Sequence, residues 1–145
     1  MLVRIKKLNE NAVIPSYGSE FAAGCDLYAC LDNPIIVNPH QTVKIPTGLA
    51  MELPIDKVGL IYARSGLATK RSLAPANKVG VIDADYRGEI IVAIHNHSDE
   101  PQQIDNHERV AQLVIAPYYQ ATFEEVDELS DTKRGTGGFG STGSK

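Results

Sequence analysis

Short apolar runs separated by turn residues dominate this chain and restrict what it can fold into. Val43-Lys44-Ile45 and the segment Ile90-Ile91-Val92-Ala93-Ile94 carry the β-branched residues that favour strands. Eight prolines and twelve glycines interrupt such runs, as at Asn33-Pro34 and Glu100-Pro101. No window of about eleven residues or more repeats its apolar positions at the helical period of about 3.6 residues. We therefore predict an all-β fold: a sandwich, a jelly roll or a barrel.

The predicted strands are short, and one helical turn is expected after Ser65. The strands are Val3–Lys7, Ile35–Val37, Thr42–Ile45, Leu49–Leu53, Val58–Tyr62, Gly88–His95, Gln102–Ile104, Val110–Ala116 and Ala121–Val126. A chain of 145 residues can bury one sizeable core but not two. The expected organisation is a β-barrel domain over residues 1–133, followed by a glycine-rich C-terminal arm over residues 134–145.

Charge and hydropathy exclude several classes of protein. A formal net charge of −4 provides no general positive field for a nucleic-acid backbone. No run approaches the ~20 apolar residues that cross a bilayer. Residues 1–7 alternate instead of forming an apolar signal core, which predicts a cytoplasmic protein or a mature chain whose targeting segment has been removed. An acidic protein that handles a polyanion would be expected to recruit a divalent cation.

The cysteines and histidines give weak signals of function. Cys25 and Cys30 do not form a CxxC pair, and buried free thiols are favoured, although a disulfide stays possible where geometry permits. His95-Asn96-His97 would place two imidazoles on one face of a strand. No third ligand is fixed by spacing, so we interpret the histidines as surface residues rather than metal ligands.

Two segments carry polar residues that suit phosphate chemistry. Arg64-Ser65-Gly66 follows a predicted strand and would present a guanidinium, a hydroxyl and an unhindered N–H at a turn. An ordinary helix entry with Ser65 as the cap is the alternative. Residues 81–89 predict a tight β-hairpin with polar groups at its tip, where a partly buried Asp83 could deprotonate water. The alternative there is a solvated turn with a surface ion pair.

The C-terminal segment changes character, with five glycines between Lys133 and Lys145. Residues 138–143 match GxGxxG, but no helix can follow, so a dinucleotide fingerprint is excluded. Ser144-Lys145 also reverses the order that a P-loop requires. A frayed terminus is the simple interpretation. The alternative is a lid that closes over phosphates with backbone N–H groups and Arg134.

Five ordered segments together resemble the motifs of the trimeric deoxyuridine triphosphatases, the dUTPases. The segments are Ala23-Gly24-Cys25-Asp26-Leu27-Tyr28-Ala29, Ala63-Arg64-Ser65-Gly66-Leu67-Ala68, Val79-Gly80-Val81-Ile82-Asp83-Ala84-Asp85-Tyr86-Arg87-Gly88-Glu89, Glu108-Arg109-Val110-Ala111-Gln112-Leu113 and Arg134-Gly135-Thr136-Gly137-Gly138-Phe139-Gly140-Ser141-Thr142-Gly143. The resemblance covers nearly the whole chain. It implies a jelly-roll-like fold, hydrolysis of dUTP to dUMP and pyrophosphate, and a homotrimer with shared active sites.

The resemblance also implies roles at the reacting end of the nucleotide. Asp83 would activate the water that attacks the α-phosphorus. Asp26 would order the water shell of a Mg²⁺ ion that is held chiefly by the phosphates. Four residues would hold the phosphates: Arg64, Ser65, Gly66 and Gln112.

At the base and sugar, the resemblance implies recognition by residues 77–86. Asn77 and the backbone near Val81 and Ile82 would read uracil and leave no room for a 5-methyl group. Tyr86 would pack on the deoxyribose and exclude a 2′-hydroxyl. In the arm, Phe139 would stack over the base, while Arg134, Ser141 and Thr142 would engage the γ end of the triphosphate. Gly140 would be a further substrate-binding residue.

Three positions depart from the family pattern: Cys25 replaces an aromatic residue, Ala63 a proline and His107 a glycine. They affect local packing rather than the proposed chemistry.

Two rival functions are a dCTP deaminase with the same fold and a nucleotide-sensing module without turnover. The first needs a catalytic glutamate near the base, and the second would have lost Asp83 or the arm.

Overall fold

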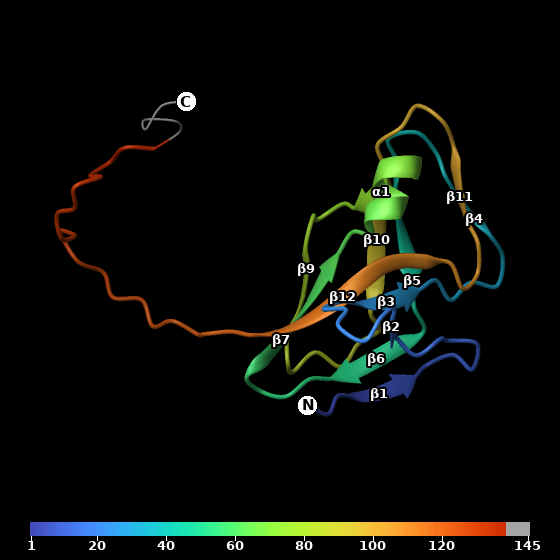
Figure 1. Ribbon diagram of the computed structural model, residues 1–145, viewed down its shortest axis with the longest axis horizontal. Helices are drawn as coiled ribbons and strands as arrows, with labels where there is room; N and C mark the ends of the chain where they lie inside the picture. The colour runs from blue at the N-terminus through green and yellow to red at the C-terminus, as the bar shows by residue number, and fades with distance from the viewer. Residues whose placement is uncertain (139–145) are drawn as a thin grey trace.

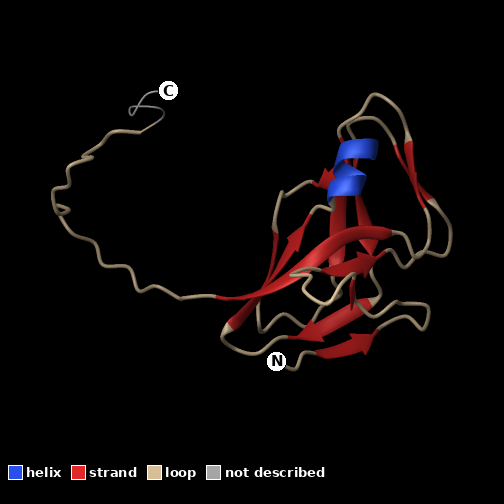
Figure 2. Ribbon diagram, viewed as in Figure 1, coloured by secondary structure: helices blue, strands red, loops and turns tan. Residues whose placement is uncertain are grey.

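The computed structural model describes residues 1–138 and shows a β-barrel with one short helix. The strands are β1 (Arg4–Lys7), β2 (Ser16–Tyr17), β3 (Cys25–Tyr28), β4 (Ile35–Val37), β5 (Thr42–Pro46), β6 (Leu49–Glu52), β7 (Lys57–Tyr62), β8 (Leu73–Pro75), β9 (Gly80–Ile82), β10 (Ile91–Asn96), β11 (Gln102–Ile104) and β12 (Arg109–Pro117). The helix is α1 (Ser65–Arg71), between β7 and β8. This confirms the all-β, jelly-roll-like prediction (Figures 1 and 2).

Four antiparallel sheets build the barrel. The largest has the order β2-β3-β12-β7-β9, and a second has the order β5-β10-β8. The pairs β1-β6 and β11-β4 complete the arrangement. Strand β12 is the longest and pairs with both β3 and β7, so the fourth motif lies beside the first motif and beside the strand that leads into the second.

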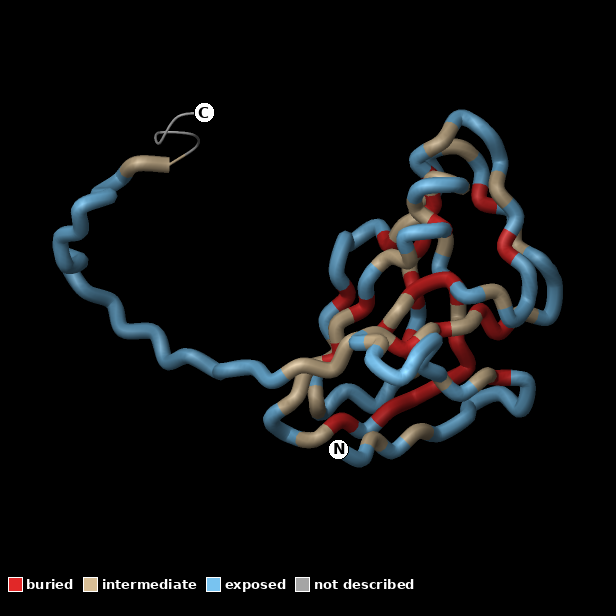
Figure 3. The backbone as a smooth tube through the Cα atoms, viewed as in Figure 1, coloured by how far each residue is buried: buried red, intermediate tan, exposed pale blue. Residues whose placement is uncertain are grey.

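The core lies between these sheets, as the buried parts of the tube in Figure 3 show. Leu27, Ile45, Ile94 and Val110 are fully buried members of one large apolar cluster. Beyond β12, residues 118–133 are exposed and extend away from the barrel as a segment that leads to the C-terminal arm (Figure 1). This segment is not stabilised by a core of its own, because its large apolar side chains, such as Tyr119 and Phe123, face solvent in the single chain.

Most predicted strands are confirmed, but the strand predicted at residues 121–126 is wrong, since these residues have no ladder partner. Strands β2, β3, β8 and β9 were missed. Each is four residues or shorter, and β3 contains the charged Asp26. Such strands are defined by pairing across the fold, which local composition does not encode.

The tight hairpin predicted over residues 81–89 is only partly present. A turn does follow β9, closed by the Tyr86 amide donating to the Asp83 carbonyl at 3.1 Å. However, β9 pairs with β7, whereas β10 pairs with β5 and β8. The chain therefore crosses between two sheets here, and the two flanking strands form no common ladder.

Cys25 and Cys30 are buried free thiols, as expected. Burial raises the pKa of both thiols, with a further contribution from the Glu89 and Asp32 charges near Cys30.

Among the described residues, no helix is long and apolar enough to cross a membrane. His107, which replaces a family glycine, has a φ of 61°, so its position requires a left-handed backbone that glycine adopts more easily.

Gly48 provides a stability test of the turn between β5 and β6. Its φ is +66°, and an added Cβ would lie 2.9 Å from the Ala12 Cβ and 3.0 Å from the Cys30 Sγ. Gly48→Ala should therefore lower the free energy of unfolding by about 2–4 kcal/mol, through strain and overpacking. Denaturant unfolding measures this change. Gly18→Ala is the control, because nothing lies within 4 Å of its added Cβ. Equal effects for the two variants would contradict the interpretation.

Candidate functional site

A polar groove of about 290 Å³ opens where β3, β12 and the start of α1 meet. Asp26 comes from β3, Gln112 from β12, and Ser65 from the first position of α1. Sheet register explains their proximity, because Gln112 pairs with Asp26 on one side and with Tyr62 on the other. The rest of the lining is Gly18, Ser19, Ala22, Gly24, Arg64, Gly66 and Arg109. The structure thus brings together residues from three predicted motifs.

Two arginines hold the Asp26 carboxylate. Arg64 Nε donates to its Oδ1 at 2.8 Å, and Arg109 Nη1 donates to its Oδ2 at 3.3 Å. The Asp26 side chain is only 13% exposed, whereas Arg109 is 52% exposed. The largely covered carboxylate therefore fixes both guanidinium groups at the edge of the groove, and this set of three side chains carries one net positive charge. The sequence places Arg109 in the fourth motif, but its contact with Asp26 becomes apparent only in the folded chain.

Backbone geometry also positions Gln112. Its Nε2 donates to the Ala63 carbonyl at 2.8 Å, which ties it to the segment before α1. An added Cβ at Gly24 would lie 2.5 Å from Gln112 Oε1. Glycine at this position therefore lets Gln112 approach the β3 end closely. Gly24 belonged to a recognised motif, but its packing role becomes apparent only in the folded chain.

The first residues of α1 leave donors open to the groove. Arg64 is the N-cap residue, and no side chain caps the helix, so the alternative of Ser65 as an N-cap is wrong. The first backbone N–H groups of a helix lack intrahelical acceptors. An added Cβ at Gly66 would meet nothing within 4 Å. Packing in the chain does not require glycine there, which leaves space for a ligand to approach the backbone.

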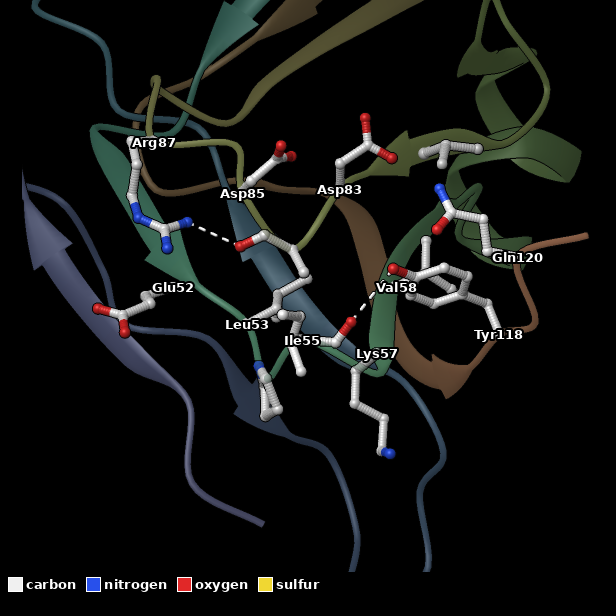
Figure 4. A pocket seen from close by; sticks show the side chains of 13 residues that line it. Glu52, Leu53, Ile55, Lys57, Val58, Asp83, Asp85, Arg87, Tyr118 and Gln120 are labelled. Atoms are coloured by element: carbon white, nitrogen blue, oxygen red, sulfur yellow. Dashed lines mark hydrogen bonds between the residues drawn. The ribbon is translucent and has the colours of Figure 1, made fainter.

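Asp83 lies in a second cavity of about 840 Å³, between the turn after β9 and the segment from Glu52 to Val58. Figure 4 shows Asp83 and Asp85 on one side of this cavity and Tyr118 on the other. Arg87 Nη1 donates to the Ala84 carbonyl at 2.7 Å, and the Tyr118 hydroxyl donates to the Ile55 carbonyl at 3.1 Å. Asp83 itself is exposed, so the expectation of partial burial is wrong for the single chain.

The groove and the Asp83 cavity share no lining residue. On β7, Gly59 pairs with Ile82 and Tyr62 pairs with Gln112. A strand advances about 3.3 Å per residue, so Asp83 and Gln112 lie about 13 Å apart along β7. They also flank β7 on opposite sides, which adds about 10 Å laterally. One chain therefore cannot bring Asp83 and Gln112 to the same small ligand group.

The remaining predicted site residues lie on residues 77–86, on the C-terminal arm, or outside the described part of the chain. Asn77 and Val81 are exposed, whereas the Ile82 side chain packs against the core. Tyr86 is 42% exposed, and its hydroxyl donates to the Glu89 carbonyl at 2.9 Å. Arg134 lies on the arm and donates to the Gly137 carbonyl, so this chain does not bring it to the groove. Phe139, Gly140, Ser141 and Thr142 lie outside the described residues.

The histidines form no metal centre within residues 1–138, where no group of three or more His, Cys, Asp or Glu side chains could hold an ion. His95 and His97 do contact each other, with ring centroids 4.5 Å apart. Partial desolvation, followed by the nearby His95, Lys78 and His40 charges, lowers the pKa of His97. The prediction of surface histidines agrees with the exposure of His40, His97 and His107.

Comparisons with known proteins agree with this arrangement. The dUTPase family model matches residues 10–143. The deoxyuridine 5'-triphosphate nucleotidohydrolase of Nautilia profundicola is 51% identical, with 99% of each chain covered. The enzyme of the same name from Desulfitobacterium hafniense strain Y51 is 53% identical over 90% of this chain and 87% of its own.

Solved structures show the same fold. A Staphylococcus bacteriophage 80alpha dUTPase with dUPNHPP superposes with a TM-score of 0.89 at 29% identity, covering 98% of each chain. A dUTPase from phage phi11 of S. aureus, described as coordinating a structural Mg(II) ion, has a TM-score of 0.79 at 25% identity, covering 90% of this chain and 100% of that one. The chain belongs to the dUTPase family.

Proposed function

We propose that this protein hydrolyses dUTP to dUMP and pyrophosphate, which limits uracil incorporation into DNA and supplies dUMP for thymidylate synthesis. The observation that carries the proposal is the groove. It combines two arginines and one carboxylate, a net positive charge, with the accessible backbone N–H groups of Ser65 and Gly66. Such a surface suits a triphosphate. The related phage enzyme with bound dUPNHPP supports a uracil nucleotide as the substrate. A cytoplasmic location remains part of this proposal.

The proposed chemistry begins at Asp83. Its carboxylate removes a proton from a water molecule, which then attacks the α-phosphorus in line with the departing pyrophosphate. Arg64, Ser65, Gly66 and Gln112 hold the phosphates and fix the direction of attack. Asp83 is exposed in the single chain, and contact with substrate and neighbouring subunits would exclude bulk water around it.

The groove is compatible with a Mg²⁺ ion bound through water. A carboxylate offers about four lone-pair positions, and Asp26 accepts only one hydrogen bond from each of its two arginines. Asp26 can therefore also accept hydrogen bonds from water molecules around an ion that the phosphates hold. When bound, Mg²⁺ supplies positive charge that stabilises the leaving pyrophosphate.

The separation of Asp83 from the groove supports a homotrimer with shared sites. Each complete site would combine Asp83 of one subunit with the groove of a neighbour. Asn77, the backbone at Val81 and Ile82, and Tyr86 would bind uracil and deoxyribose on the Asp83 side. In this scheme a second subunit is necessary for catalysis, because one chain holds the two half-sites too far apart.

The arm would complete the site. Residues 1–133 form the proposed catalytic domain and residues 134–145 the proposed closing arm, with contacts from Arg134, Phe139, Gly140, Ser141 and Thr142. The direction of residues 118–138, away from their own barrel, supports an arm that serves another subunit (Figure 1). Neither nucleic acid nor a membrane is a proposed partner.

One assay separates this function from its rivals. Pyrophosphate release is measured with dUTP, dTTP, dCTP and UTP as alternative substrates. We expect release from dUTP at a rate at least about a hundredfold above the others. Formation of a uracil nucleotide from dCTP would indicate a deaminase. Tight binding of dUTP without any product would indicate a sensing module.

Truncation of the arm tests its proposed role. Deleting residues 134–145 should lower kcat/KM for dUTP by about a hundredfold, because the arm organises the triphosphate and excludes water. The barrel should keep its melting temperature, since residues 118–134 are exposed and lie outside the core. Steady-state kinetics and thermal unfolding are measured on the same sample. Full activity would make the arm a simple terminus, and loss of folding would make it a structural element.

Gly66 offers a test of the groove without a change in charge. Gly66→Ala should leave the melting temperature unchanged or slightly raised, because alanine favours a helix and its Cβ has free space. The methyl group would occupy the space proposed for a phosphate, so kcat/KM for dUTP should fall about tenfold. The control is Lys70→Ala, at an exposed position on the same helix. A normal kcat/KM for Gly66→Ala would exclude close phosphate approach at this residue.

A further inference from the structure

The loop after β9 holds Tyr86 in one orientation through contacts with its own next residues. The Tyr86 ring folds back along the chain, and its hydroxyl donates to the Glu89 carbonyl at 2.9 Å. The Tyr86 amide donates to the Asp83 carbonyl at 3.1 Å. The orientation of the Tyr86 ring is thus tied to the segment that carries Asp83.

Gly88 lies against the hydroxyl end of this ring. An added Cβ at Gly88 would be 2.6 Å from the Tyr86 Cζ and 3.1 Å from its Cε2. Ordinary van der Waals contact begins at 3.4 Å, so the Cζ atom would have to move by about 0.8 Å. Gly88 is not among the glycines with positive φ, and the backbone conformation therefore does not require glycine. The close approach of the tyrosine ring is what requires it.

Glu89 anchors the same segment to the barrel. Its Oε1 accepts a hydrogen bond from the Gly48 amide at 2.8 Å. The next residue, Ile90, is bound through its amide to the Leu49 carbonyl at 2.8 Å and through its carbonyl to the Thr47 hydroxyl at 2.6 Å. The segment whose carbonyl accepts the Tyr86 hydroxyl is therefore hydrogen-bonded on both sides to the buried β5–β6 turn, which restricts its movement.

We infer that Gly88 and Glu89 are positioning residues that set the Tyr86 ring and thereby the discrimination between deoxyribose and ribose. This inference rests on the proposed function. The hydroxyl end of the ring approaches Gly88, while the tyrosine remains 42% exposed and open to a ligand. A ring that packs on the C2′ carbon of deoxyribose leaves no space for a hydroxyl group there. Discrimination of this steric kind depends on a ring that cannot retreat.

The experiment compares kcat/KM for dUTP and UTP in wild type and in Gly88→Ala. A displacement of nearly 1 Å should reduce the dUTP-to-UTP ratio by roughly ten- to a hundredfold, whereas a purely structural defect would lower both rates together. The decisive control repeats Gly88→Ala in a Tyr86→Ala background. There we expect a further change in the ratio of less than about twofold, because no ring remains to be displaced.

Glu89 is tested by a pair of variants. Glu89→Ala removes the acceptor for the Gly48 amide and should also lower the ratio, whereas Glu89→Gln retains an acceptor oxygen and should restore most of it. A wild-type ratio in Gly88→Ala, or an equal effect of this substitution with and without the Tyr86 ring, would overturn the inference. Absence of dUTP hydrolysis in the wild-type protein would instead overturn the proposed function, so the two failures are distinguishable.

Discussion

Replacing Asp83 with asparagine is expected to lower kcat for dUTP by roughly 10²–10⁴. Asparagine keeps the size of the side chain and one acceptor oxygen, but it cannot take a proton from water. The binding of a non-hydrolysable dUTP analogue should remain within about threefold of wild type, because Asp83 does not line the groove proposed to hold the phosphates. Rapid-quench kinetics and calorimetry with the same analogue measure the two quantities.

A matched control makes this result specific. Asp32→Asn removes one carboxylate at an exposed position and should leave kcat unchanged. Near-normal turnover in Asp83→Asn would assign the base to another residue, of which Asp85 in the same cavity is the first to examine.

Mixing two inactive variants is expected to restore activity if the sites are shared. Asp83→Asn leaves the groove intact, and Arg64→Gln leaves Asp83 intact while weakening phosphate binding. In a randomly mixed trimer, about one site in four combines an intact Asp83 from one subunit with an intact groove from its neighbour. Refolding a 1:1 mixture should therefore recover about a quarter of wild-type activity, although each variant alone is nearly inactive.

The separation of Asp83 from Gln112 within one chain is the reason for this expectation. Asp83 would hold the attacking water and Gln112 a phosphate, and these two groups must touch to react. Within one chain, Asp83 and Gln112 are more than about 10 Å apart along β7, which is too far for that contact. Refolding each variant alone provides the control for the mixing procedure. No recovery in mixed trimers of confirmed composition would place the complete site within one chain and contradict the shared-site scheme.

Local pattern made much of the fold predictable. The runs at residues 42–45 and 110–116 have β-branched and apolar residues bounded by turn residues, and they became β5 and β12. The helical turn predicted after Ser65 became α1. The strand predicted at residues 121–126 is absent, because β propensity alone does not make a strand when no partner strand lies alongside.

The all-β class, the family and the candidate residues were predictable from the chain, because turn chemistry, apolar patterning and motif order are local or ordered features of a sequence. Which of those residues meet depends on the folded chain. Register across β3, β12 and β7 brings Asp26, Gln112 and the residues after Tyr62 to one groove and leaves Asp83 at another cavity. The contacts of Arg109 with Asp26 and of Gly88 with Tyr86 depend on close approach in space, which spacing along a chain does not specify.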